Sequence, residues 1–361
     1  MRSLAVSILA ILLAATAAVA QTPPASQTET VQPPPFGEKV EVNAVLIDAI
    51  VTDRDGNQIL GLEKDDFAAT EDGARQALDS ADYYTSRKLL NTKEENAPFK
   101  VEQVHEQRYI VFFFDKPEDN QLFSRVALAR TGVNDFLNKQ MTDADKVAIV
   151  GHDVRLKIYS DFTSDKVKLK KALDEVSRFS KGTTTPTTDP DTPSIFTHLD
   201  ANRMMNKTGT VYQALTEIAD ALQPIRGRKN LILFSVGIHE PGEVVRGGVP
   251  LTESRYYTPM VEALNEANVS VYPMNLSPDA PSAPVYHQTL ERVADETNGE
   301  YFRFPVTYTS PINQVAKISA GYYLLTYRTN KTGRGYQKVA VSVKNHPELR
   351  VTARTGYLYG Y

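Results

Sequence analysis

Four oxygen-bearing side chains stand where predicted strands end or helices begin, and they are the residues best placed to do chemistry. Asp115 follows an apolar run over 109–114, and Asp119 lies four positions on, at the start of a predicted helix. Thr210 opens a later helix, and Ser235 ends another apolar run. In open α/β sheets, ligands bind beyond the carboxyl ends of the strands, so these residues predict a ligand-binding edge. A plainer role for Asp115 is to accept hydrogen bonds from backbone amides at the helix that starts near residue 119.

These residues can meet only if the centre of the chain forms one sheet. Apolar runs indicate buried strands, and apolar residues at helical spacing separate them. The predicted strands are 109–114, 147–150, 231–234, 269–272 and 300–304, and the predicted helices are 121–139, 165–178, 210–223, 256–267 and 286–297. Such alternation predicts a doubly wound, largely parallel α/β domain of Rossmann-like type over 107–320.

The segments on either side of this domain have the pattern of β-structure. Residues 38–86 and 321–361 show strand-like alternation interrupted by turn residues such as Asp55-Gly56 and Asp72-Gly73. We expect the two segments to pack together as one β-sandwich into which the α/β domain is inserted. Residues 87–106 are charged and aperiodic, which predicts a linker.

The connection over 180–208 is unusually long. Helix and strand connections in compact domains commonly have 2–8 residues, and much longer ones are functional or disordered. The segments 237–253 and 275–285 are also long and rich in Pro and Gly. One interpretation of these connections is a cap that binds a partner, with Phe196, Met204, Tyr256 and Tyr257 as anchors; the other is a set of mobile insertions.

The amino terminus predicts export. Arg2, an apolar run over 4–19 and the triplet Ala18-Val19-Ala20 have the order of a cleavable signal peptide over 1–20. The Pro-rich stretch over 21–37 then predicts a disordered tether. No later run reaches spanning length, so we expect no membrane span after cleavage. An exported chain of 361 residues with no Cys fits a bacterial periplasm or extracellular space better than an animal one.

Composition narrows the class of function. The chain is 41% hydrophobic and 23% charged, which allows a sizeable core. A formal net charge of −4 with both signs mixed argues against a nucleic-acid partner. No recognised catalytic or nucleotide-binding motif is present, and the 6 His are scattered. We therefore predict a non-enzymatic protein.

Several stretches resemble known proteins when taken together. The strand-ending Asp115, the helix-opening Thr210, the segment GRKNLILFSVG and the flanking VNAVLIDAIVTDRDGNQILGLEKDDF and YYLLTYR resemble the von Willebrand factor A-related proteins of the acidobacterial type. The resemblance covers about 38–359. It implies a protein-binding or cell-adhesion module with a metal-ion-dependent adhesion site, where a divalent cation is bound by an Asp-x-Ser-x-Ser motif, a loop Thr and a later Asp.

This sequence departs from that motif. Asp115 matches, Pro117 replaces the first Ser, Asp119 replaces the second, and Ser235 replaces the later Asp. Together with Thr210, these residues imply a degenerate site for Mg²⁺ or another divalent cation, because hard cations prefer oxygen ligands. The alternatives are a metal-independent structural interaction protein and an enzyme using Asp115 and Asp119. The partner is expected to be a protein of unknown identity.

Overall fold

The computed structural model describes residues 43–85, 103–105, 107–183, 185–238, 245–246, 249–250, 255–277, 286–329, 331 and 335–359. The predicted signal peptide and tether, and most of the predicted linker, lie outside these residues. No helix among the described residues has the length and apolar character needed to cross a membrane.

A five-stranded sheet forms the centre of the α/β part of the chain. The strands are β6 (Arg108–Asp115), β7 (Asp145–Asp153), β8 (Arg155–Thr163), β9 (Lys229–Ser235) and β12 (Val269–Asn275). Their order across the sheet is β12-β9-β6-β7-β8. All neighbours are parallel except β8, which pairs antiparallel with β7 at one edge. The strand order reverses direction between β6 and β9, which makes that position the topological switch point.

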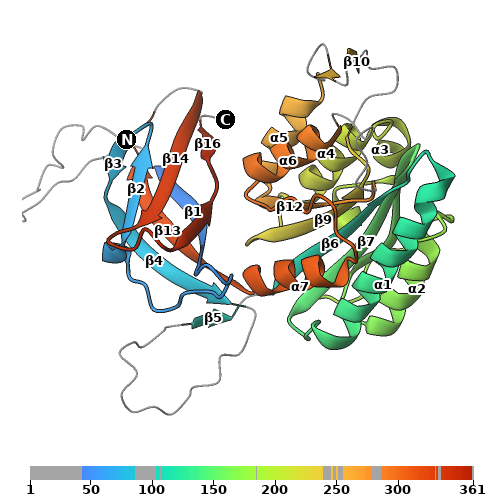
Figure 1. Ribbon diagram of the computed structural model, residues 1–361, viewed down its shortest axis with the longest axis horizontal. Coiled ribbons are helices and arrows are strands. Elements are labelled where there is room, and N and C mark those ends of the chain that lie inside the picture. The colour runs from blue at the N-terminus through green and yellow to red at the C-terminus, as the bar shows by residue number, and fades with distance from the viewer. Residues whose placement is uncertain are drawn as a thin grey trace, which may run out of the picture. The chain divides into compact units, whose positions relative to one another are not determined.

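Helices cover both faces of this sheet (Figure 1). One face packs against α4 (Val211–Leu222), α5 (Tyr257–Glu266) and α6 (Tyr286–Glu296), and the short α3 (Ala201–Asn206) packs beside them. The other packs against α1 (Phe123–Lys139), α2 (Lys166–Val176) and α7 (Thr309–Ile318). β6 is buried along its whole length, which explains its unbroken apolar sequence.

The flanking segments build two antiparallel layers. The larger sheet has the order β15-β1-β13-β4-β5, and the smaller has the order β16-β14-β2-β3. The strands are β1 (Asn43–Thr52), β2 (Phe67–Glu71), β3 (Ala74–Gln76), β4 (Leu78–Thr85), β5 (Gln103–His105), β13 (Gly321–Thr329), β14 (Gly335–Val343), β15 (Arg350–Ala353) and β16 (Gly356–Tyr359). Only β5 joins in parallel.

Residues from both ends of the chain share the core of these layers. Ile47 of β1 and Phe67 of β2 lie in one buried cluster with Tyr323, Leu325 and Val339. β1 pairs directly with β13 and β15, so segments almost 300 residues apart form one sheet. The predicted fold class, a doubly wound α/β domain inserted in a β-sandwich, is confirmed.

Three parts of the α/β domain differ from the sequence prediction. The strand β8 and the helix α7 were not predicted from the sequence. The strand predicted over 300–304 is wrong, since only Phe302 forms a single bridge, with Met274. The remaining described elements are the short helices η1 (Lys64–Asp66), η2 (Asn120–Leu122) and η3 (Ile195–Thr197) and the strands β10 (Val245–Arg246) and β11 (Val249–Pro250).

The long connection over 180–208 is largely ordered and runs along the edge strand β8. Thr183 N–H donates to the Ile158 carbonyl at 2.6 Å. A Cβ added to Gly182 would lie 2.6 Å from the same carbonyl oxygen, so this close approach requires glycine. η3 and α3 lie within the connection. It therefore covers an edge that would otherwise be exposed to strand pairing.

Candidate functional site

The carboxyl ends of β6, β7 and β9 meet at the topological switch point, as the sequence predicts. Asp115 ends β6 and is 7% exposed, and Ser235 ends β9 and is fully buried. The Ser235 hydroxyl donates to Asp115 Oδ2 at 2.7 Å and accepts from Gly237 N–H at 3.1 Å. The predicted pair is thus in direct contact, although Ser235 lies beneath Asp115 and does not reach the surface.

His152 is a site residue that the sequence analysis missed. It stands in register with Asp115 on the neighbouring parallel strand β7. Its Nδ1 lies 3.4 Å from Asp115 Oδ1, and its Nε2 lies 3.1 Å from the Thr208 carbonyl oxygen. The available signal was its position at the end of the second buried strand, beside the first in the predicted sheet.

A pocket of about 480 Å³ opens beside Asp115. Thr210 and Glu118 also line it. Thr210 is the N-cap of α4, because its hydroxyl oxygen accepts from Gln213 N–H at 3.2 Å. Thr210 and Asp115 therefore share one pocket, as predicted.

Asp119 has a different position from the other predicted residues. It is the N-cap of η2, where its Oδ1 accepts from Gln121 N–H at 2.8 Å, and it is not among the residues that line the pocket. The helix-capping role that the sequence suggested for Asp115 thus belongs to Asp119, while Asp115 accepts from side chains.

Charged groups at the pocket rim neutralise one another. Asp153 accepts from Lys116 Nζ at 3.0 Å and from Lys157 Nζ at 3.1 Å. Partial burial raises the pKa of Asp153, but these two hydrogen bonds and the lysine charges outweigh it and hold the pKa below its ordinary value. Asp153 is therefore an anion with both oxygens already engaged.

The donor set fits a divalent cation poorly. Asp115 has one oxygen bonded to Ser235 and the other beside His152, while Asp119 caps η2. Among the residues that the structure describes, no three His, Asp or Glu side chains cluster closely enough to hold a metal ion. A cation here would require Asp115 to exchange its present partners for the ion.

The same contacts bear on nucleophilic chemistry. A serine nucleophile needs a base within hydrogen-bond reach of its hydroxyl. Here the Ser235 hydroxyl donates to a carboxylate and is fully buried, while His152 Nε2 faces a backbone carbonyl. The arrangement therefore holds Asp115 in place, and the full burial of Ser235 keeps its hydroxyl away from a substrate.

The rim of the pocket carries backbone strain. Val154 lies at the turn between β7 and β8 with φ of 63°, a left-handed conformation that β-branched residues rarely adopt. Its side chain is 71% exposed and lines the pocket, and the Met205 side chain is 63% exposed. Arg155 holds both backbones, donating to the Val154 carbonyl at 2.7 Å and to the Met205 carbonyl at 2.6 Å. Two exposed apolar side chains are thereby fixed beside a polar pocket.

The anchors predicted for a partner-binding cap are partly wrong. Met204 and Tyr257 are 8% and 3% exposed and belong to the core cluster under α4 and α5. Phe196 and Tyr256 are partly buried against the same cluster. These side chains contribute to folding, and the exposed apolar residue of this region is Met205.

No protein-family model matches the sequence, and no curated protein matches it either. Solved structures do resemble the chain. The von Willebrand factor domain of the pili tip protein Mfa5 from Porphyromonas gingivalis is 13% identical, with a TM-score of 0.39, covering 59% of this chain and 95% of that one. An aerotolerance-related membrane protein from Bacteroides fragilis is 12% identical, with a TM-score of 0.38, covering 58% and 98%.

A third similar structure is the manganese-loaded TRAP protein of Plasmodium vivax, at 12% identity and a TM-score of 0.35, covering 69% of this chain and 93% of that one. At such identities and TM-scores, the likeness concerns the fold and carries no ligand or partner to this chain. Structures of von Willebrand factor A type are thus among those that the chain resembles, and the acidobacterial type stays a prediction.

Proposed function

We propose that this chain is an exported, non-enzymatic protein-binding module that contacts its partner with the pocket at the carboxyl edge of the sheet. The observation that carries the proposal is the strained Val154 at the rim of that pocket. Strain of this kind costs of order 1–3 kcal/mol and clusters at functional sites. The exposed Met205 lies beside it and adds apolar surface.

Polar groups lie beside these two apolar side chains. Asp115, Glu118, His152 and Thr210 line the pocket and offer a partner hydrogen-bonding groups next to the exposed Val154. The full burial of Ser235 supports binding over catalysis. Export rests on the sequence of residues 1–20 alone, and it would make the partner a protein of the periplasm or of the cell exterior.

Substitution at the rim tests the proposal. The full chain is immobilised and exposed to an extract of the envelope and secreted proteins of its source, with bound proteins quantified by mass spectrometry. Val154→Asp should lose partners that the wild type retains. Val167→Asp is the matched control, because Val167 is 78% exposed on α2 and does not line the pocket. Equal recovery by the two variants would refute this site.

A divalent cation bound by Asp115, Asp119, Thr210 and Ser235 is a more specific form of the same proposal. Calorimetric titration with Mg²⁺, Ca²⁺ and Mn²⁺ tests it on the wild type and on Asp115→Asn, with exposed Asp143→Asn as the control. Saturable heat that only Asp115→Asn abolishes supports the cation. No heat with any of the three ions leaves a metal-independent module.

A further inference from the structure

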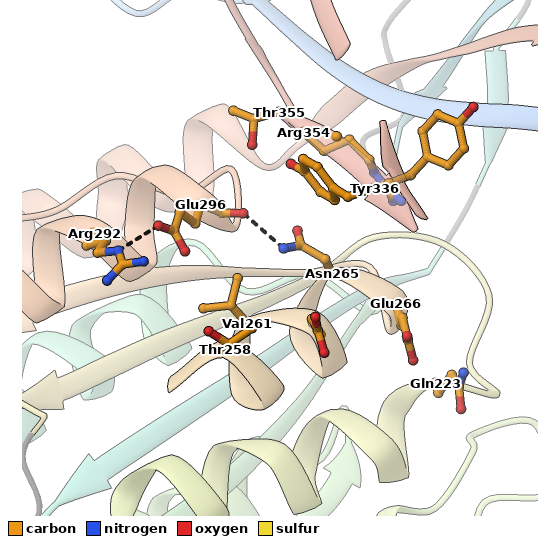
Figure 2. A pocket seen from close by; sticks show the side chains of 13 residues that line it. Gln223, Thr258, Val261, Asn265, Glu266, Arg292, Glu296, Tyr336, Arg354 and Thr355 are labelled. Atoms are coloured by element: carbon orange, nitrogen blue, oxygen red, sulfur yellow. Dashed lines mark hydrogen bonds and ion pairs between the residues drawn. The ribbon is translucent and has the colours of Figure 1, made fainter. Parts of the chain in front are cut away.

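A second groove of the described structure lies away from the carboxyl-edge pocket. It measures about 840 Å³ and is bordered by α5 and α6 on one side and by residues 354–357 and Tyr336 on the other (Figure 2). We call it the α5–β16 groove. All of its lining residues belong to the compact unit Val42–Tyr361.

Hydrogen bonds connect the two sides of the groove. Arg354 Nη2 donates to Asn268 Oδ1 at 2.9 Å, and Asn268 in turn donates to the buried Asp48. Asn268 follows Ala267, the C-cap of α5, and has φ of 52°, which Asn tolerates better than most residues. Hydrogen bonds between polar side chains therefore connect the elements on the two sides of the groove.

One wall of the groove carries two carboxylates that do not stabilise the helix on which they lie. Glu262 and Glu266 are exposed, four residues apart on α5, and Glu266 is the last residue of that helix. Like charges at this spacing disfavour a helix, and so do anions at its carboxyl end. Within the described residues neither carboxylate has an ion-pair partner. Both would be stabilised by a cation that enters the groove.

The other charged groups of the groove already have partners. Arg292 donates to Glu296 at 2.7 Å and lies over the Tyr257 ring at 4.1 Å from its centroid. The backbone carbonyl of Glu296 accepts from Asn265 at 3.0 Å, as the dashed line in Figure 2 shows. Arg354 is bonded to the neutral Asn268 amide, so the lining carries three carboxylates (Glu262, Glu266 and Glu296) against two guanidiniums (Arg292 and Arg354). The excess charge of the groove is therefore negative, and Glu262 and Glu266 are its carboxylates without an ion-pair partner among the described residues.

The opposite wall offers an aromatic ring and a strand edge. Tyr336 is 51% exposed, and its ring lies over Gly356, where an added Cβ would come within 2.3 Å of Tyr336 Cζ. β16 is the terminal strand of its sheet, with β14 as its single strand neighbour in the described chain. An edge strand can hydrogen-bond an added extended segment, and an exposed Tyr ring can contact a Lys or Arg side chain.

We propose that the α5–β16 groove is a second binding site, which takes an extended basic segment of a partner protein. The segment lies along β16 and directs Lys or Arg side chains toward Glu262 and Glu266, with Tyr336 packing against their aliphatic parts. This site is independent of the carboxyl-edge pocket, so the two can be tested separately.

A designed peptide tests the groove with the full chain. The probe is a fluorescently labelled peptide of alternating valine and lysine, and its counterpart has glutamate in place of lysine. Fluorescence anisotropy should show saturable binding of the lysine peptide alone. The double variant E262Q/E266Q should weaken it about fivefold, as expected for the loss of two exposed ion pairs. Binding should also weaken as NaCl is raised, because the charges are exposed.

A matched double variant shows whether binding depends on where the acidic residues lie or only on the net charge of the protein. E291Q/D295N removes two acidic groups at the same four-residue spacing on α6, outside the groove, and should bind the peptide like the wild type. Tyr336→Ala should weaken binding without changing its salt dependence. The proposal is overturned if both double variants lose binding equally or if the glutamate peptide binds as well. It is also overturned if sedimentation velocity shows that the wild type is a dimer and that E262Q/E266Q is a monomer, because the groove would then bind a second copy of the chain.

Discussion

Asp161 is the residue on which the order of the long connection over 180–208 depends. It lies on β8, is 5% exposed, and its carboxylate accepts four hydrogen bonds. Phe162 N–H at 2.9 Å and Ile195 N–H at 3.0 Å donate to Oδ1. Thr187 N–H at 2.8 Å and the Ser194 hydroxyl at 2.5 Å donate to Oδ2. Three of these donors come from the connection, so one side chain holds it against the edge of the sheet.

Asp161→Asn should destabilise the protein by about 2–3 kcal/mol. The amide can keep the two bonds to Oδ1, but its NH₂ group would then face Thr187 N–H, and an unsatisfied buried donor costs about 1–3 kcal/mol. The remaining bonds also lose the strength that an ionised acceptor provides. Urea unfolding followed by circular dichroism measures the total loss of unfolding free energy. Hydrogen exchange over 180–208 measures how far the connection itself loses protection.

Asp191→Asn is the matched control for this prediction. Asp191 is exposed in the same connection, and only its backbone N–H makes a bond, to Asp189 at 3.1 Å. It should change stability by less than about 0.5 kcal/mol. If Asp161→Asn changes the free energy of unfolding as little as Asp191→Asn does and leaves hydrogen exchange over 180–208 unchanged, Asp161 does not organise the connection.

Three further predictions concern strain, pH and a buried ion pair. Val154→Asn should raise stability by about 1 kcal/mol in urea unfolding, because Asn tolerates the left-handed backbone, and a loss of stability would contradict the strain argument. Burial raises the pKa of Tyr308 to about 12, so the native state holds this proton more tightly than the unfolded chain. That stabilisation is complete below pH 10 and is lost as the pH rises toward 12, so the urea midpoint of the wild type should fall more steeply over this range than that of Tyr308→Phe. The Arg108 side chain is 4% exposed, the Asp145 side chain is fully buried, and Arg108 Nε lies 2.7 Å from Asp145 Oδ1. Asp145→Ala should therefore cost about 3–5 kcal/mol in thermal or urea unfolding, and the Arg108→Met, Asp145→Leu double variant should cost much less.

Part of the candidate site could be predicted from local patterns. Asp115 and Ser235 each end an apolar run, and in a parallel sheet such ends lie at one edge, so their proximity was predictable without coordinates. Thr210 was predictable in the same way, because an N-cap residue precedes a run with helical periodicity. These are short-range signals that depend on residue type and spacing.

The partners of these residues were not predictable in that way. His152 faces Asp115 because of the register between β6 and β7, which no local pattern encodes. Whether Asp115 or Asp119 caps the helical turn depends on where the chain bends after β6, and the structure assigns that role to Asp119. Val154 is an ordinary valine in the sequence, and its strain exists only because the β7–β8 turn requires a left-handed residue there.

The sequence by itself therefore determined the fold class and the edge at which the site lies, because hydrophobic periodicity and strand-end polarity are local properties of the chain. Tertiary structure decided which further side chains meet those that end the strands. The α5–β16 groove is the clearest case, since Glu262 and Tyr336 border it from segments more than 70 positions apart. Contacts of that kind arise from packing between elements, so they cannot be predicted from the spacing of residues within one element.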